Sequence, residues 1–340
     1  MNLFKLSGKD IGIDLGTGTT LVAIKNEGIA KVQPSVIAMD KKSKQVIAVG
    51  EKAKEMLGKT PDNIIAIKPL KNGVIADLTA TELMLKEIMS ILRRKKAIGR
   101  PRVVIGIPSG ITEVEKRAVE EAVYDAGARQ VFLIDEPLSS AIGAHLNITE
   151  PTGNLVVDLG AGITEVAVIS LGGIVLTTST NIAGDELDQK IIEYIRKEKR
   201  VEIGETIAEK IKIEIGNAKP GPIEKMEVKG RDLTTGLPRT LVIDSFEIEY
   251  AMRKSLEKII NTIKVTIEKT PPELVADITQ KGITLCGGGA LLKRFDELIS
   301  DSIGIPVYVA PEPLYCMVNG AEKTLDNTTK IKDLQSRRLR

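Results

Sequence analysis

Two short stretches of the sequence place a carboxylate, glycines and threonines in an order suited to binding phosphate with a metal ion. The first, DLGTGTTLVAI, runs from Asp14 to Ile24, and the second, DLGAGITEVAV, runs from Asp158 to Val168. Glycines let the backbone approach a ligand closely, and successive N–H groups in such a turn form an anion-binding concavity. An aspartate before the turn can hold hydrated Mg²⁺ against phosphates. The two stretches therefore predict a pair of turns that bind a polyphosphate.

Each turn is expected to join two strands of a hairpin. From Thr20 onward the residues are β-branched and alternating, as in a strand, whereas the glycine-rich motifs of dinucleotide-binding and P-loop proteins lead into a helix. Leu21 stands where G-x-G-x-x-G needs its third glycine, and neither turn contains G-K-[ST]. Both of those nucleotide-binding motifs are therefore excluded at the turns.

The near-repetition of the stretch indicates a duplicated α/β fold. Seven of the eleven aligned positions are identical, and the flanking strand patterns repeat as well. The alternative is two unrelated hairpins with similar turn chemistry, which leaves the repeated flanks unexplained. Duplication predicts two similar domains that face each other across a cleft. The predicted first domain covers residues 1–145 and 316–340 with a small subdomain at about 33–74, and the second covers 146–315 with a small subdomain at about 184–243.

The composition is that of a globular protein without a bulk affinity for nucleic acid. The 340 residues are 42% hydrophobic and 28% charged, with a formal net charge of +2. Two cysteines cannot form a disulfide framework, and a single histidine excludes a histidine-rich metal site. No apolar run reaches about 18 residues, and the start MNLFKLSGKD is too short and polar for a signal peptide. We therefore expect a cytoplasmic protein.

Helices with clear start signals are expected between the strands. Thr79 with Glu82, and Thr112 with Glu115, each form a predicted capping box before an apolar-periodic segment. Glu136 opens a further helix directly after the buried strand VFLID, a place suited to a positioned carboxylate. The alternative role for Glu136 is a favourable charge at a helix N-terminus.

A third glycine-rich stretch, CGGGALLKRF from Cys286 to Phe295, is expected at a strand-to-helix junction. Helix N–H groups would there point at a ligand, and bare glycine backbone would leave room for a flat base or a ribose. Three consecutive glycines are weak evidence alone, so this stretch indicates nucleotide binding only together with the two turns.

Six motifs in this order resemble those of the MreB family of bacterial actins, within the superfamily of actins, sugar kinases and heat-shock chaperone ATPases. Besides the two turns, they are DEP at 135–137, NIAGDELD at 181–188, AEKIKIEIGNA at 208–218 and LCGGGALL at 285–292. The resemblance extends from about Asp10 to Leu325. It implies duplicated actin-like, ribonuclease H-like α/β domains around a nucleotide cleft, each with a small subdomain.

The same resemblance implies which residues bind ATP. Those that would cradle the phosphates are Thr17, Gly18 and Thr19 in the first turn and Gly160, Ala161 and Gly162 in the second. Those that would contact ribose and adenine are Glu209, Lys210, Ile211 and Lys212. Those that would back the nucleoside are Gly287, Gly288, Gly289 and Ala290. Apart from the resemblance, Glu209 and Lys212 share a helix face and could simply form a solvated salt pair.

The resemblance also implies a metal site and a catalytic residue. Asp14 and Asp158 would hold Mg²⁺ through water, and Glu136 would orient the attacking water. The family usually has two threonines in the second turn, but this chain has Ile163 before Thr164. Isoleucine offers no donor or acceptor to the water, and neighbours on a strand point to opposite faces. We therefore expect ATP binding with weak ATPase activity, unless the substitution has no kinetic consequence.

The expected function is that of an actin homologue that polymerises with ATP into filaments of paired protofilaments at the inner face of the cytoplasmic membrane and supports cell shape. Two segments favour peripheral membrane contact: an apolar cluster at Leu3, Phe4 and Leu6, and a basic tail from Lys330 to Arg340. Each basic residue near an anionic leaflet contributes about 1 kcal/mol, and a filament adds avidity. The alternative for the tail is a disordered basic end. The resemblance also implies a hydrophobic membrane loop near Ala97 and Ile98. Only these two apolar residues are present there, which is too few for such a loop.

Two other functions remain open on the sequence. A non-hydrolysing accessory subunit could copolymerise with sibling filament proteins, which the isoleucine in the second turn allows. A small-metabolite kinase of the same superfamily would need a catalytic aspartate base, and no convincing candidate is present.

Overall fold

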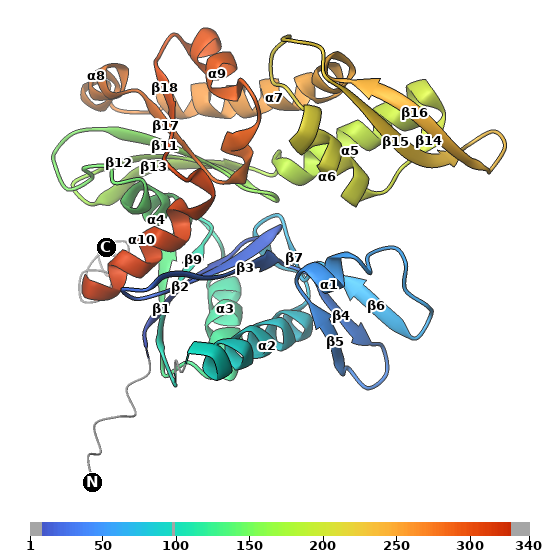
Figure 1. Cartoon of the computed structure of the whole chain (residues 1–340). Helices are drawn as coiled ribbons and strands as arrows, with labels where there is room; N and C mark the ends of the chain where they lie inside the picture. Colours follow the sequence, from blue (N-terminus) through green and yellow to red (C-terminus); the bar gives the residue numbers. More distant parts are fainter. Residues whose placement is uncertain (1–8, 97–98, 328–340) are drawn as a thin grey trace. The chain divides into compact units, whose positions relative to one another are not determined.

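A computed structural model describes residues 9–96 and 99–327 of the chain, which divide into two compact units (Figure 1). The first unit takes the described parts of 1–151, 169–175 and 314–340, and the second takes 152–168 and 176–313. The apolar cluster at Leu3–Leu6, the basic tail and the Ala97–Ile98 pair lie outside the described residues. No helix in the described part is long and apolar enough to cross a membrane.

The first unit is built on a five-stranded mixed sheet in the order β10-β9-β1-β2-β3. Its strands are β1 (Ile11–Leu15), β2 (Thr19–Ile24), β3 (Gly28–Pro34), β9 (Arg102–Ile107) and β10 (Gln130–Asp135). β1, β2 and β3 form antiparallel pairs, whereas β9 runs parallel to β1 and β10. The predicted hairpin around the first turn is therefore confirmed, with Leu15 opposite Thr20.

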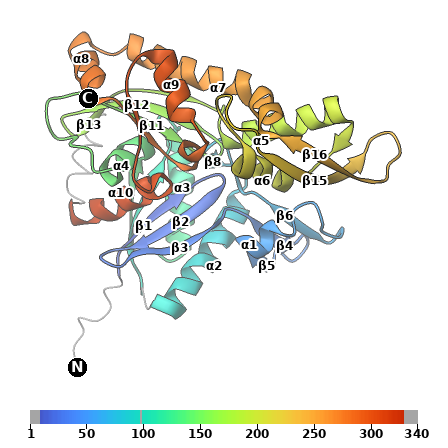
Figure 2. The ribbon, with the colours of Figure 1, turned by 45° about the horizontal axis from the view of Figure 1, so that its top comes forward.

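Helices cover both faces of this sheet, which explains why β1 and β9 are almost continuously apolar (Figures 1 and 2). One apolar cluster joins the sheet to α2 (Leu78–Lys96) and α3 (Glu113–Asp125). On the other face, α10 (Cys316–Thr324) packs on β1 and on α4 (Glu136–Gly143). Gly12 allows this approach, since a Cβ there would lie 2.8 Å from the Glu322 nitrogen.

A small region extends the first unit beyond β3. It contains a three-stranded sheet in the order β5-β4-β6, a short helix and a two-stranded hairpin. The elements are β4 (Ile37–Asp40), β5 (Val46–Val49), α1 (Glu51–Lys54), β6 (Ile64–Ile67), β7 (Leu70–Lys71) and β8 (Val74–Ile75).

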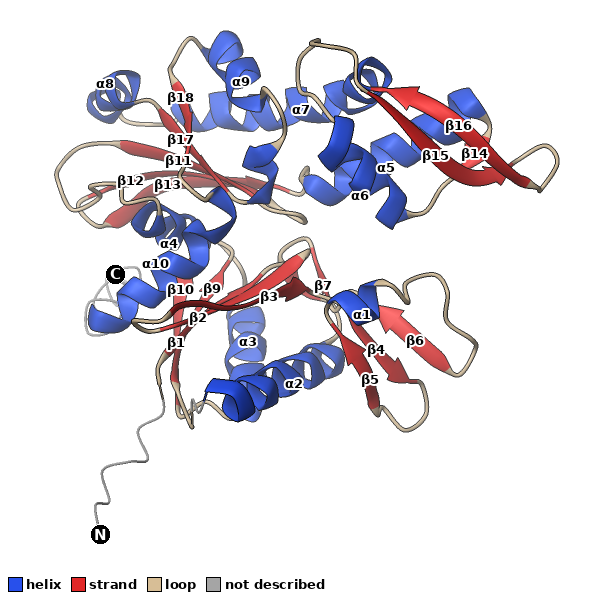
Figure 3. Cartoon of the chain, in the orientation of Figure 1, coloured by secondary structure: helices blue, strands red, loops and turns tan. Residues whose placement is uncertain are grey.

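A second five-stranded sheet, most of which belongs to the second unit, repeats the plan in the order β13-β12-β11-β17-β18 (Figure 3). Its strands are β11 (Asn154–Leu159), β12 (Thr164–Ser170), β13 (Gly173–Thr180), β17 (Ile283–Cys286) and β18 (Val307–Val309). β11, β17 and β18 are parallel. The two central strands therefore end at the same edge, where Asp158 lies opposite Cys286.

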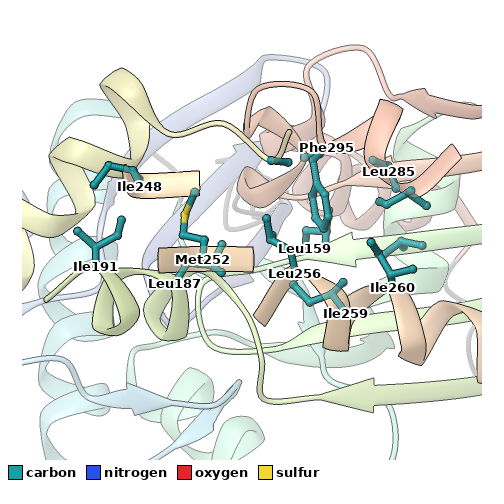
Figure 4. Close-up of a cluster of buried hydrophobic side chains, with 14 of the residues drawn as sticks. Leu159, Leu187, Ile191, Ile248, Met252, Leu256, Ile259, Ile260, Leu285 and Phe295 are labelled. Atoms are coloured by element: carbon teal, nitrogen blue, oxygen red, sulfur yellow. The ribbon is translucent and has the colours of Figure 1, made fainter. Parts of the chain in front are cut away.

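One continuous apolar core holds the second unit together (Figure 4). The 24-residue helix α7 (Ser245–Glu268) is its centre, with Met252, Leu256 and Ile259 almost fully buried. The helix begins at a complete capping box, in which the Asp244 side chain accepts from the Glu247 nitrogen. The other helices of the unit are α5 (Gly184–Tyr194), a π-helical turn (Ile195–Lys199), α6 (Glu205–Ile215), α8 (Pro272–Lys281) and α9 (Phe295–Ile303). A sheet of β14 (Val201–Glu202), β15 (Lys225–Asp232) and β16 (Pro238–Asp244) adjoins α6 and α7.

Two local expectations need correction. The helix expected to start at Thr79 starts at Leu78, and its cap is Asp77, whose carboxylate accepts from the Ala80 nitrogen at 2.9 Å. Aspartate and threonine are both good caps, so the sequence offered two registers. The glycine triplet does not run straight into an α-helix: it leads into a 3₁₀ helix at Gly288–Leu291, and α9 follows at Phe295. The capping box of Thr112 and Glu115 is confirmed.

Candidate functional site

The first glycine turn is fixed from behind by Ser35, the residue that follows β3. The Ser35 hydroxyl donates to the Gly16 carbonyl at 2.6 Å, and its backbone N–H donates to the Gly18 carbonyl at 3.0 Å. The Thr20 hydroxyl bonds to the same serine oxygen at 2.8 Å, and both side chains are fully buried. Two carbonyls of the turn are therefore engaged by one residue, which sets the orientation of the peptides between them.

Thr17 connects the first turn to the β7–β8 hairpin. Its side chain is buried, and its hydroxyl oxygen accepts from the Gly73 N–H at 2.9 Å. Gly18 and Thr19 are half-buried at the same turn. Asp14 is the second-last residue of β1, just before the turn, and is half-buried. The structure thus brings four of the predicted residues together around one turn.

Glu136 lies where the sequence placed it, at the first position of α4 after β10. It lines a recess of the first unit, together with Leu15 and Gly73 from the elements beside the first turn. Gly106 borders the same recess, and a Cβ there would lie 3.2 Å from the Glu136 Cγ. Within the first unit, the predicted catalytic carboxylate therefore shares a recess with Leu15, which precedes the first turn, and with Gly73, whose N–H donates to Thr17 of that turn.

The second turn is closed on itself and held from behind by the start of α5. The Gly160 N–H donates to the Ile163 carbonyl at 3.0 Å. The N–H groups of Gly184 and Asp185 donate to the carbonyls of Gly160 and Ala161 at 3.1 and 2.7 Å. As at the first turn, the residues after the third strand of the sheet engage two carbonyls of the turn.

Thr164 cannot supply the hydroxyl that Ile163 lacks. The Thr164 side chain is fully buried, and its hydroxyl donates to the Ile182 carbonyl at 2.8 Å. Ile163 is half-buried at the end of the turn. The second turn therefore offers an apolar side chain at the position where the family usually has a hydroxyl.

The glycine triplet lies against the end of β11. Gly287 has a φ of +80°, and a Cβ there would lie 2.7 Å from the Asp158 Oδ1 and 2.5 Å from the Leu159 carbonyl oxygen. At Gly289 a Cβ would lie 2.9 Å from the Leu159 Cβ. Gly288 is exposed and Ala290 is buried. Two of the three glycines are thus required by close packing beside Asp158, whatever else they contact.

The predicted ribose and adenine segment lies on α6, where its four side chains face different surroundings. Ile211 is fully buried in the core, and Lys210 is exposed and paired with Glu214. The Lys212 ammonium lies 2.8 Å from the Asp188 Oδ1 and donates to the Gly184 carbonyl at 2.8 Å. The structure therefore places Lys212 beneath the second turn and does not bring the side chains of Lys210 and Ile211 there.

Asp188 is the most perturbed carboxylate near this turn. Burial raises the pKa of Asp188 to about 6, although Lys212 acts in the opposite direction. The negative charges of Glu209 and Asp185 raise this pKa further. Glu209 and Asp185 thus add negative charge near Asp188, which pairs with the Lys212 ammonium behind the second turn.

The carboxylates at the two turns have the chemistry that Mg²⁺ prefers. Magnesium keeps several waters and usually binds through one or two carboxylates together with substrate phosphates. Asp14 and Asp158 are half-buried, and each is the second-last residue of a strand that leads into a glycine turn. Among the described residues there is no group of three or more potential ligands that could hold a metal ion by themselves. The residues present fit a magnesium ion that is shared with phosphate.

The fold and these turns define duplicated actin-like α/β domains. The sequence pattern of the MreB/Mbl protein family matches residues 8–333. Cell shape-determining protein Mbl of Bacillus subtilis (strain 168) is 46% identical over 324 residues, which cover 95% of this chain and 97% of that protein. Cell shape-determining protein MreB of Escherichia coli (strain K12) is 47% identical over 323 residues and 93% of each chain. The chain belongs to the MreB/Mbl family.

Solved structures agree with this assignment. MreB5 of Spiroplasma citri bound to ADP matches with a TM-score of 0.89 at 36% identity, over 97% of this chain and 99% of that chain. A structure of the same protein bound to AMPPNP matches equally well. The MamK double helical filament, at 20% identity and a TM-score of 0.78 over 93% of this chain and 98% of that chain, shares the fold. The predicted fold and the resemblance to this family are confirmed.

Sequence reasoning missed the residues that hold the turns. Ser35, Gly184 and Asp188 carry no ligand-binding pattern by themselves, and their roles depend on contacts between distant segments. A weak signal was available, because Gly184 and Asp188 lie within the NIAGDELD motif. For Ser35 the only hint was its place directly after a strand next to a proline.

Proposed function

We propose that this protein binds ATP with Mg²⁺ and polymerises into actin-like filaments that control cell shape. The observation that carries the proposal is the matched construction of the two turns. Each follows an aspartate at a strand end, and each has two carbonyls engaged from behind by the segment after the third strand. Peptides held in this way can present N–H groups to a phosphate without reorganising when it binds.

The proposed phosphate contacts are the turn residues predicted from the sequence: Thr17, Gly18 and Thr19, with Gly160, Ala161 and Gly162. Bound Mg²⁺ supplies positive charge to the phosphates, and Asp14 and Asp158 are proposed to hold its waters. Gly287 to Ala290 are proposed to back the nucleoside, and Glu209 and Lys212 remain the proposed contacts of α6 with ribose and adenine. Support comes from relatives that are bound to ADP and AMPPNP.

ATPase activity is proposed to be weak. Glu136 is proposed to orient the attacking water, as a half-buried carboxylate in a recess beside the first turn. Phosphoryl transfer depends on positioning and electrostatics, so one lost positioning hydrogen bond slows it by on the order of 10²-fold. Ile163 supplies no such bond, and Thr164 is engaged by the Ile182 carbonyl.

Filament formation and membrane association are proposed from different kinds of support. Relatives at 46–47% identity are cell shape-determining proteins, and a protein of the same fold forms a double helical filament. Filaments of this chain are proposed to be paired and to lie at the inner face of the cytoplasmic membrane. The apolar start and basic tail of the sequence are the segments proposed to contact anionic lipid.

The test is calorimetric titration of the protein with ATP, with and without Mg²⁺, followed by sedimentation and electron microscopy with and without anionic liposomes. Magnesium-dependent binding and sedimenting filaments are expected. Asp14→Ala and Asp158→Ala should each remove the magnesium dependence. If wild-type protein shows no magnesium-dependent affinity, or if both variants keep it, the proposed nucleotide site is wrong.

A second candidate function is an accessory subunit that joins filaments of a related protein without hydrolysing ATP. Ile163 is the observation that favours it. Mixing this protein with a sibling filament protein should then produce copolymers, whereas the protein alone should stay in the supernatant.

A further inference from the structure

The two phosphate turns are held by the same strategy but with different chemistry. Ser35 holds the first turn directly, through its own hydroxyl and N–H. The second turn is held by N–H groups of Gly184 and Asp185, the first two residues of α5. The position of the second turn therefore depends on the position of the N-terminus of α5.

Lys212 fixes that N-terminus from α6. Its ammonium donates to the Gly184 carbonyl at 2.8 Å and lies 2.8 Å from the Asp188 carboxylate, one turn further along α5. Gly184 is packed tightly between the two sides: a Cβ there would lie 3.3 Å from the Ala161 Cα and 3.4 Å from the Lys212 Nζ. A chain of contacts thus runs from Lys212 through Gly184 to the carbonyls of Gly160 and Ala161.

The pair is buried enough for its geometry to matter. The side chain of Lys212 is 17% exposed and that of Asp188 is 10% exposed. A buried charge that loses its partner is strongly unfavourable, so neither side chain can leave the pair at little cost. Lys190 on α5 is more exposed, at 34%, and it pairs with the partly exposed Glu186 and Glu193, so it does not have this constraint.

We propose that Lys212, together with Asp188, is a positioning residue for the second phosphate turn, which it acts on through the N-terminus of α5. This inference rests on the proposed ATP site and changes the role of one of its members. The family resemblance implies that Lys212 contacts the ribose. The geometry instead has its ammonium engaged by Asp188 and the Gly184 carbonyl.

The two roles predict that the contribution of Lys212 to binding depends differently on the number of phosphates in the ligand. A lysine that contacts ribose contributes equally to the binding of adenosine, AMP and ATP. A lysine that orders the phosphate turn contributes to ATP and little to adenosine. The Lys212→Met variant separates the two, because it keeps the length and apolar stem of the side chain but removes the charge.

The experiment measures the dissociation constants of adenosine, AMP and Mg·ATP by calorimetry for wild type, Lys212→Met, Lys212→Arg and Asp188→Asn. Lys190→Met, at a more exposed position of α5, is the matched control. We expect Lys212→Met to weaken ATP binding by about tenfold to a hundredfold, the equivalent of one charged hydrogen bond, and adenosine binding by less than about threefold. Lys212→Arg should recover part of the loss, and Lys190→Met should bind like wild type.

A second readout follows the turn itself. Hydrogen–deuterium exchange at Ala161 to Ile163 should rise in Lys212→Met and stay unchanged in Lys190→Met. The pH profile gives a third readout, because protonated Asp188 no longer attracts Lys212. The ratio of wild-type to Asp188→Asn affinity for ATP should therefore fall as the pH is lowered through about 6. Lys212, Glu209 and Asp185 are the charged groups that face Asp188.

Equal losses for adenosine and ATP in Lys212→Met, or no loss at all, would overturn the inference while the proposed function stands. If Lys212→Met does not fold, the ATP-to-adenosine pattern of Asp188→Asn decides in the same way. Absence of ATP binding by wild type would contradict the proposed function itself, which the wild-type titration detects before any variant is compared.

Discussion

Asp158 and Gly287 lie in direct contact at the carboxyl ends of two parallel strands. A Cβ on residue 287 would lie 2.7 Å from the Asp158 Oδ1, and the φ of +80° already favours glycine there. The proposed magnesium ligand of the second unit is thus placed against bare backbone of the glycine triplet. Through Gly287, this contact joins Asp158 to the glycine segment that is proposed to back the nucleoside.

The first prediction uses this contact. Gly287→Ala should displace Asp158 and weaken magnesium-dependent ATP binding by about tenfold or more, as is typical when a group that orients a metal ligand is changed. Titrations with and without Mg²⁺ measure the effect. Gly236→Ala is the matched control, because Gly236 has a φ of +74° and no atom within 4 Å of its Cβ position. Equal effects of the two substitutions would show that backbone strain, and not contact with Asp158, is responsible.

The second prediction concerns hydrolysis. Ile163→Thr should raise the rate of phosphate release by on the order of 10²-fold, because it restores a hydroxyl beside the proposed path of the water. Ile163→Val keeps the apolar character and should leave the rate unchanged. Glu136→Gln in the Ile163→Thr background should remove the gain. Brisk hydrolysis by wild type, with no increase in Ile163→Thr, would contradict the proposal.

The third prediction concerns Ser35, which engages the carbonyls of Gly16 and Gly18. Ser35→Ala removes the bond to Gly16 and deprives the buried Thr20 hydroxyl of its bond to Ser35, so it should lower the free energy of unfolding by about 1–3 kcal/mol. ATP affinity should fall as well, because the first turn loses one anchor. Ser43→Ala, at an exposed turn, should change neither quantity. Chemical denaturation and calorimetry together check both effects.

The fourth prediction is a pH dependence of stability. The pKa of Asp188 is raised from 3.8 to about 6, so the folded state binds a proton more tightly than the unfolded state. Its contribution to stability is therefore greatest at low pH and declines as pH rises from about 4 through 6, by at most about 3 kcal/mol. Denaturant unfolding of wild type and Asp188→Asn between pH 4.5 and 7.5 measures this. The stability of wild type relative to Asp188→Asn should decline with rising pH, and a constant difference would contradict the assignment.

Much of the candidate site could be predicted because its signals are local. The two hairpin turns, the aspartates before them and the carboxylate that opens α4 each depend on a few consecutive residues. Strand pattern, turn chemistry and helix-start signals act over such short ranges. The cap of α2 was misplaced by two residues because Asp77 and Thr79 are both acceptable caps and only packing distinguishes them.

The sequence by itself determined the duplicated α/β plan, the two glycine turns and the family, since periodicity and short motifs specify elements before they are packed. Only the tertiary structure decided what holds the turns in place. Ser35, which follows β3, bonds to the first turn between β1 and β2. Lys212 on α6 bonds to Gly184 of α5 beneath the second turn. Such contacts join segments that are separated along the chain, so they depend on how the elements pack, and no local pattern of residues encodes them.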